Sequence, residues 1–270
     1  MGNSNKDPNY QCEFHQNFDI MENIYTADYK VRIADADQFG RLKMPALLQM
    51  LQEIATEHAK EIGVAYDNLK PLNLGWALSK IIVKLDRIPT WGERVYIKTW
   101  PSSRDRIATY REFSATDIDG SPLFSARSQW LLFDTLQRRI ARMNRLGEWP
   151  LNAMTANRES FDEGFEKISE NPLSLVKTQY EARNDDIDLN GHVNNSVFLI
   201  WGVESVPAEF AKNLEPSLIK VSFLEEVRPH NKIDALCEIC GNKTATSLRS
   251  PENGREYARI ATNWRSVQMS

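Results

Sequence analysis

The stretch Asp186-Ile-Asp-Leu-Asn-Gly191 repeats Asp35-Ala-Asp-Gln-Phe-Gly40 at a constant offset of 151 residues (186 minus 35). Glu53 and Glu204 keep the same offset further along the chain. Because an acidic turn with the same spacing occurs twice, the sequence predicts two copies of the same structural unit.

Each turn is followed by a predicted helix. The first helix starts at Pro45, and its apolar positions recur at helical spacing, which predicts one strongly buried face. That face consists of Leu47, Leu48, Leu51, Ile54, Ala55 and His58. In the second copy, residues 195–204 are predicted to form the equivalent helix.

Alternating apolar and polar residues predict antiparallel strands around both helices. The runs in the first copy are 75–86, 94–100, 107–117 and 123–133, and those in the second are 176–182, 218–224, 232–239, 245–249 and 256–265. A shorter match pairs Asp86-Arg-Ile-Pro89 with Glu226-Val-Arg-Pro229 at an offset of 140. We therefore expect an α+β fold with two copies of a long helix wrapped by an antiparallel sheet, each covering the other's exposed surfaces.

This pattern divides the chain into four segments. Residues 1–24 are polar and aperiodic and are expected to form a tail. Residues 25–142 form the first copy, the charged and irregular residues 143–172 form a linker, and residues 173–268 form the second copy.

The composition excludes several classes of protein. A hydrophobic fraction of 41% is enough for a sizeable core, and a net charge of −4 gives no global electrostatic reason to bind nucleic acid. No apolar run approaches the roughly 18 residues that span a bilayer, and the chain lacks a signal-like leader. We expect a cytoplasmic protein without membrane insertion, and the lack of a Ser- and Arg-rich leader favours a bacterial over a plastid protein.

Cys237 and Cys240 form the motif C-x-x-C, which occurs in metal sites and redox pairs. They lie in an alternating run, where a separation of three residues places two side chains on opposite faces of a strand. The two cysteines are therefore predicted to be structural.

The turn in the second copy carries the chemistry. It offers Asp188, Asn190 and His192, whereas the first copy has Phe39 and Arg41 in place of the last two. A helix N-terminus presents unpaired N–H groups and a partial positive charge, which stabilise an oxyanion on an attacked carbonyl. An acid, an amide and an imidazole at such a place point to acyl transfer. Alternatively, the Asp and Asn only form a turn and the His is a loop residue.

Two further asparagines follow this turn. Asn194 or Asn195 is predicted to cap the helix, and Gly191 suits the tight turn before it. We expect both asparagines to contribute to substrate binding.

In this order, four motifs make the chain resemble the acyl-acyl-carrier-protein (acyl-ACP) thioesterases of plants and bacteria. They are Leu51-Gln-Glu-Ile-Ala, Leu85-Asp-Arg-Ile-Pro-Thr-Trp-Gly92, Thr99-Trp100 and Asp186-Ile-Asp-Leu-Asn-Gly-His-Val-Asn-Asn195. The resemblance implies a tandem (double) hot-dog fold that hydrolyses fatty acyl-ACP to free fatty acid, without a metal or cofactor.

The resemblance also implies catalytic residues. These are Asp188, Asn190 and His192, with a further acid matched to Glu226, although Glu225 is the alternative. We assign His192 and Glu226 to activating the nucleophile and Asn190 to positioning by hydrogen bonds. Asp188 either holds this network or attacks the thioester itself.

The chain departs from the plant pattern directly after the matched acid. Many plant members have a cysteine there, a candidate nucleophile, and this chain has Val227. A thiol mechanism at that position is therefore excluded.

Because the first copy lacks the polar triad, we expect one active site per chain. By resemblance, the first copy holds the acyl chain, in a tunnel lined by Leu47, Met50, Leu51, Trp76 and Leu78. The alternative is that these residues are ordinary core residues.

Acyl carrier protein is acidic, so its phosphopantetheine-linked acyl chain should be delivered to a basic surface. Our candidate is the arginine cluster of Arg138, Arg139, Arg142 and Arg145. A run of charges is also typical of a simply solvated face.

Three other functions are compatible with the same fold. An acyl-CoA thioesterase shares the chemistry, a non-catalytic acyl-binding protein would use the polar loop only structurally, and a dehydratase would need a 3-hydroxyacyl substrate. Chain-length preference and the formation of a homodimer are left open by the sequence.

Overall fold

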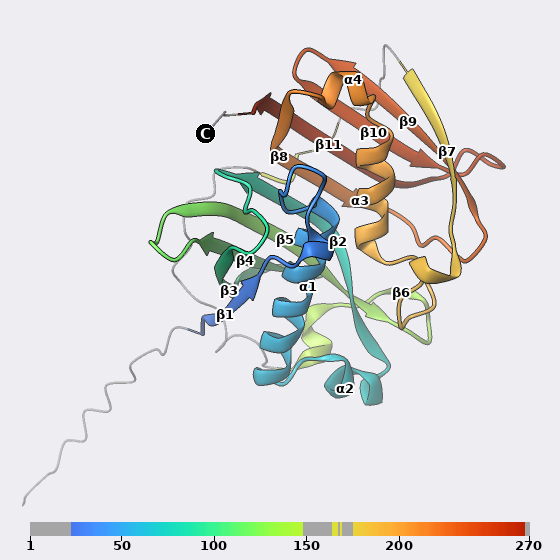
Figure 1. The fold of residues 1–270 in the computed structure, drawn as a ribbon. Coiled ribbons are helices and arrows are strands. Elements are labelled where there is room, and N and C mark those ends of the chain that lie inside the picture. The colour runs from blue at the N-terminus through green and yellow to red at the C-terminus, as the bar shows by residue number, and fades with distance from the viewer. Residues whose placement is uncertain (1–22, 148–163, 167, 169–174, 268–270) are drawn as a thin grey trace, which may run out of the picture.

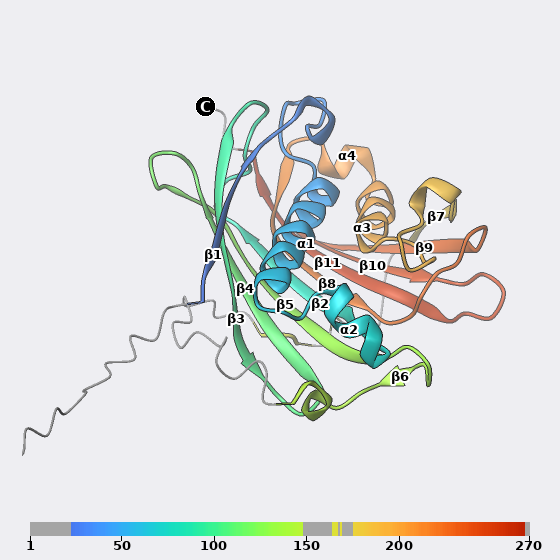
Figure 2. The ribbon, with the colours of Figure 1, turned by 90° about the horizontal axis from the view of Figure 1, so that it is seen from below.

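Two strands far apart in the sequence, β2 (Leu74–Leu85) and β8 (Leu214–Phe223), pair antiparallel and join the two halves of the protein. Their register runs from Lys80 opposite Ser222 to Lys84 opposite Leu218. The computed structural model describes residues 23–147, 164–166, 168 and 175–267. Within this part of the chain, all strands belong to one sheet, which curves around two helices (Figures 1 and 2).

The order of strands shows the duplication directly. The order is β1-β3-β4-β5-β2-β8-β11-β10-β9-β7, so the second half mirrors the first across the β2–β8 pair, and β6 pairs with β5. The bounds in the first half are β1 Tyr25–Lys30, β3 Arg94–Arg104, β4 Ala108–Thr116, β5 Pro122–Asp134 and β6 Arg139–Ile140. In the second half they are β7 Leu175–Glu181, β9 Lys232–Cys240, β10 Lys243–Arg249 and β11 Glu256–Ser266.

Two longer helices, α1 (Met44–Glu61) and α3 (Asn195–Glu204), pack against each other on the same face of the sheet (Figure 2). The predicted apolar face of α1 is buried along its length. Helix α3 approaches β11 so closely at Gly202 that an added Cβ atom would lie 3.1 Å from Ile260. The described residues also contain two short helices, α2 (Tyr66–Leu69) and α4 (Ala208–Ala211), and 3-10 turns at Ile33–Asp35, Lys70–Leu72, Met143–Leu146 and Asn184–Asp186.

The predicted two-copy architecture is thus present, and the predicted helix at residues 195–204 matches α3 at both ends. Strand ends differ by a few residues. The differences are largest at β3, which continues to Arg104, and at β8, which begins at Leu214 although Pro216 interrupts its pattern. The structure also places Cys237 in the interior and Cys240 at the surface, as the strand alternation predicted.

One sequence match was wrong. The amide of Leu42 bonds the carbonyl of Pro89, and the equivalent amide of Val193 bonds that of Val227, so the copies correspond here at an offset of 138 residues (227 minus 89) and not 140. The sequence match was displaced by two residues from the structural alignment, because a shift of two preserves the alternation of a strand-like segment. Ile88, and not Asp86, therefore occupies the place of Glu226.

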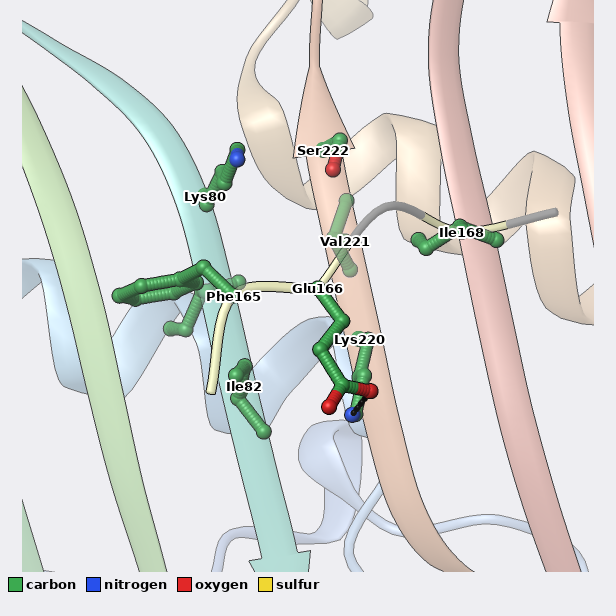
Figure 3. A pocket seen from close by; sticks show the side chains of 9 residues that line it. Lys80, Ile82, Phe165, Glu166, Ile168, Lys220, Val221 and Ser222 are labelled. Atoms are coloured by element: carbon green, nitrogen blue, oxygen red, sulfur yellow. Dashed lines mark ion pairs between the residues drawn. The ribbon is translucent and has the colours of Figure 1, made fainter. Parts of the chain in front are cut away.

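The predicted tail falls almost entirely, and the predicted linker largely, outside the described residues, and the four segment boundaries remain predictions. Of the predicted linker, residues 164–166 and 168 cross the face of the sheet opposite α1 and α3 (Figure 3). There Glu166 lies 3.9 Å from the Lys220 ammonium, and the carbonyl of Ile168 accepts a hydrogen bond from Arg259. In the described part of the chain, no helix is long and apolar enough to cross a membrane.

Candidate active site

The loop before α3 is held by the carboxylate of Asp188. Its Oδ1 accepts the amide N–H of Asn190 at 2.8 Å and that of His192 at 3.4 Å, while Oδ2 accepts the side-chain amide of Asn190 at 3.3 Å. Gly191 has a φ of 77°, a left-handed conformation that suits glycine. The predicted triad therefore lies together in one turn.

The first copy has the same turn without the same chemistry. Asp37 Oδ1 accepts the amides of Phe39 and Arg41 at 2.8 and 2.9 Å, as Asp188 does in the second copy. The guanidinium of Arg41 bonds Asp37 and lies 4.8 Å from the centroid of the Phe39 ring. With Ile88 buried where the second copy has Glu226, this copy contains no pairing of acid and imidazole at its turn.

The acid that meets the imidazole is Glu226. Its Oε2 lies 3.0 Å from His192 Nε2. The neighbouring Glu225 instead pairs with Arg255 at 2.8 Å. The geometry thus separates the two candidate acids and brings Glu226, from the segment after β8, to the loop before α3.

Asn194 caps α3. Its Oδ1 accepts both the amide and the hydroxyl of Ser196 at 2.9 Å, and its own amide bonds the carbonyl of Asp186 at 2.8 Å. Asn195 is the first residue of the helix. Because Ser196 and Val197 donate their amides to Asn194, the described residues leave the amide of Asn195 available for an incoming oxygen.

The first copy contributes two contacts that the sequence analysis missed. From α1, Gln49 Nε2 donates to the buried Ser196 hydroxyl at 3.1 Å. From the turn between β5 and β6, Arg138 Nη2 lies 3.0 Å from Glu226 Oε2. Nothing in a single sequence marks these pairs, since their partners are 147 and 88 residues away.

The members of the arginine cluster differ in their surroundings. Arg145 binds Asp134 and donates to the carbonyl of Leu72 at 3.2 Å, so it fastens the turn between β5 and β6. Arg139 and Arg142 are exposed. Arg138 is the member that reaches the active-site loop.

The five predicted tunnel residues do not form one group. Leu47, Met50, Leu51 and Leu78 lie in the main core between the helices and the sheet. Trp76 packs in a separate cluster, and its indole N–H donates to the carbonyl of Val64 at 3.0 Å. A small apolar cavity between α1, α3 and the β2–β8 pair is lined by Met44, Leu47, Leu48, Ile81, Val83, Leu199, Ile219 and Val221.

A buried polar group lies at the far end of α1. Arg111 Nη1 contacts His58 Nδ1 at 2.8 Å and Thr99 Oγ1 at 3.2 Å, and Tyr25 stacks on the imidazole. Burial, reinforced by the Arg111 charge, lowers the pKa of His58 to about 4. This histidine is therefore neutral near pH 7.

Comparison with known proteins finds two family models along the chain. The acyl-ACP thioesterase N-terminal domain matches residues 22–145, and the acyl-ACP thioesterase C-terminal domain matches residues 170–266. Together they cover more than half of the chain.

Individual relatives agree with these matches. The chain is 27% identical to oleoyl-acyl carrier protein thioesterase 1, chloroplastic, of Arabidopsis thaliana, over 91% of this chain and 77% of that protein. It is 24% identical to the chloroplastic palmitoyl-acyl carrier protein thioesterase of Gossypium hirsutum, over 90% of this chain and 64% of that one.

Solved structures show the same fold. The 12:0-ACP thioesterase from Umbellularia californica superposes with a TM-score of 0.83 at 22% identity, covering 91% of this chain and 98% of that one. An acyl-ACP thioesterase from Bacteroides thetaiotaomicron VPI-5482 gives 0.80 at 23% identity, covering 91% and 99%. The expected tandem hot-dog fold is thereby confirmed.

Proposed function

The chain belongs to the acyl-ACP thioesterase family, whose members are thioester hydrolases, and we propose that its hydrolysis of acyl-ACP to free fatty acid takes place at Asp188, Asn190, His192 and Glu226. The observation that carries this proposal is the contact of 3.0 Å between His192 Nε2 and Glu226 Oε2 beside the N-terminus of α3. The degenerate first copy has the same turn without this pair.

The pair assigns a direction to proton transfer. A carboxylate that accepts from Nε2 fixes the imidazole tautomer and leaves Nδ1 to take a proton from water. The water oxygen then bonds the thioester carbon, and the carbonyl becomes an oxyanion stabilised by the amide of Asn195 and the partial positive charge of the helix terminus. Collapse breaks the C–S bond, and the proton on His192 passes to the departing phosphopantetheine thiolate.

We assign Asp188 to orientation and not to attack on the thioester. Its Oδ1 accepts two backbone amides, the same role that Asp37 has in a copy without catalytic groups. Its Oδ2 accepts from the side chain of Asn190, which places that amide in the turn beside the reacting groups.

The experiment measures free fatty acid released from a panel of acyl-ACP thioesters and from acyl-CoA thioesters of matched chain length. We expect turnover of acyl-ACP, with loss in H192A and retention in R41A, which changes the equivalent position of the first copy. Faster turnover of acyl-CoA would favour a CoA-specific hydrolase, and full retention of every thioester would favour an acyl-binding protein.

Acyl carrier protein is the partner, and we propose that it docks beside this site on the exposed Arg139 and Arg142. Both follow the turn that reaches Glu226, so a docked acidic carrier would lie near the loop. Raising the ionic strength should then increase the KM for acyl-ACP.

A cytoplasmic location stays a prediction, and whether two chains form a homodimer is a question for sedimentation analysis.

A further inference from the structure

Arg138 connects the two copies at the reacting groups. It lies in the turn between β5 and β6 of the first copy. Glu226 Oε2 lies 3.0 Å from Arg138 Nη2 and also 3.0 Å from His192 Nε2. The first copy, which has lost its own polar triad, thus supplies a cation to the site of the second.

The backbone at Arg138 adds an independent observation. Its φ of 49° is in the left-handed region, which non-glycine residues occupy at a cost on the order of 1 kcal/mol. The turn itself is fixed by Asp134, whose Oδ1 accepts the amides of Leu136 and Gln137 at 3.1 and 2.8 Å and whose Oδ2 binds Arg145. Glycine would suit position 138 better, so the turn does not need an arginine there.

We propose that Arg138 is a positioning residue that holds the Glu226 carboxylate oriented toward His192 Nε2. A charge-assisted bond from a guanidinium restricts the carboxylate to an orientation in which it accepts from the imidazole. This inference rests on the proposed function, because it acts through the same pair of residues. It differs from the sequence-based expectation that Arg138 contacts the carrier protein.

Within the described part of the chain, the charged groups near Glu226 have other partners, so Arg138 is the cation that orients its carboxylate. Arg255 is engaged by Glu225, and Arg145 is engaged by Asp134. The carboxylate of Asp188 is occupied by its own turn. The ion pair itself is largely solvent-exposed, so it contributes little to stability.

The test uses R138G and R138K in the full chain, with R255A as the control, because Arg255 is an exposed arginine that pairs with the neighbouring Glu225. Each variant is assayed with acyl-ACP and with the acyl-pantetheine thioester of the same chain length, which has no carrier protein to dock. We expect R138G to lower kcat about tenfold or more on both thioesters, while KM for acyl-ACP changes less than about threefold. R138K keeps the charge and should lose less than R138G.

A further readout separates a positioning role of Arg138 from a structural role. The thermal midpoint of R138G should equal or exceed that of the wild type, because glycine relieves the left-handed strain.

An unchanged kcat for acyl-pantetheine in R138G, with a raised KM for acyl-ACP, would show that Arg138 serves carrier docking and would overturn the proposal. An equal loss in R255A on acyl-pantetheine would do the same. If the wild type hydrolyses neither thioester, the proposed function fails, whatever the result for Arg138. The H192A variant, assayed with the same thioesters, tests the proposed function separately from Arg138.

Discussion

His192 Nε2 lies 3.0 Å from Glu226 Oε2, although His192 precedes α3 in the sequence and Glu226 follows it. If this pair activates water, H192A should lower kcat by at least about a hundredfold, the scale of losing a general base. E226Q keeps the shape of the side chain but removes the negative acceptor, and we expect it to lower kcat as well. Release of free fatty acid from acyl-ACP measures both.

The matched control for Glu226 is its neighbour. E225Q breaks only the pair with Arg255 and should leave kcat within about twofold, because an exposed ion pair has little energetic weight. A larger loss in E225Q than in E226Q would reverse our assignment of the acid.

Asp188 is tested by comparing two substitutions. D188A removes the acceptor of two backbone amides and should lower kcat at least about a hundredfold. D188N retains an oxygen that can accept those amides, so an orienting role predicts clearly higher activity than in D188A. Equal inactivity of the two variants, with intact circular dichroism, would instead identify Asp188 as the nucleophile.

These residues show what one sequence can reveal. The repeat around Asp37 and Asp188 predicted the duplicated fold, because acidic turns and helix starts are local signals. The same comparison isolated His192, since its counterpart Arg41 cannot act as a base near neutral pH.

Contacts between the copies were not predictable in the same way. Gln49 and Arg138 reach the site through the packing of α1 on α3 and through the turn between β5 and β6. Their partners are fixed by tertiary structure alone, and the misplaced match of Asp86 to Glu226 shows how little a short strand-like pattern constrains register.

The cap of α3 gives a prediction about stability. N194A removes the oxygen that accepts from the Ser196 amide and should lower the free energy of unfolding by about 1 kcal/mol, whereas N194D should retain the cap. K43A is the control, because Lys43 is the N-cap residue of α1 and makes no side-chain cap bond there. Urea denaturation followed by circular dichroism measures these values, and equal losses in N194A and K43A would contradict the capping role.

His58 predicts how stability depends on pH. Because its pKa is about 4 in the folded protein and about 6.5 when unfolded, the unfolded state binds more protons between these values. The contribution of His58 to the free energy of unfolding is therefore fully present above pH 6.5. It is lost as the pH falls toward 4, by about 3 kcal/mol in total.

In H58Q this part of the pH dependence should disappear, whatever the stability of the variant at neutral pH. The measurement is the free energy of unfolding between pH 4 and pH 7 for both proteins. Parallel curves for the wild type and H58Q would assign the loss to other groups.

The acyl chain should be selected near Leu47, the predicted tunnel residue that lines the cavity between α1 and α3. L47F fills this space, so we expect the ratio of kcat/KM for long over short acyl-ACP to fall about tenfold, the scale of one to two methylene groups in an apolar pocket. W76F is the control, because Trp76 packs in a separate cluster. Since overpacking alone costs about 1–3 kcal/mol, the ratio of two substrates on one folded variant is the informative quantity. An unchanged ratio in L47F, or an equal shift in W76F, would place the acyl chain elsewhere in the protein.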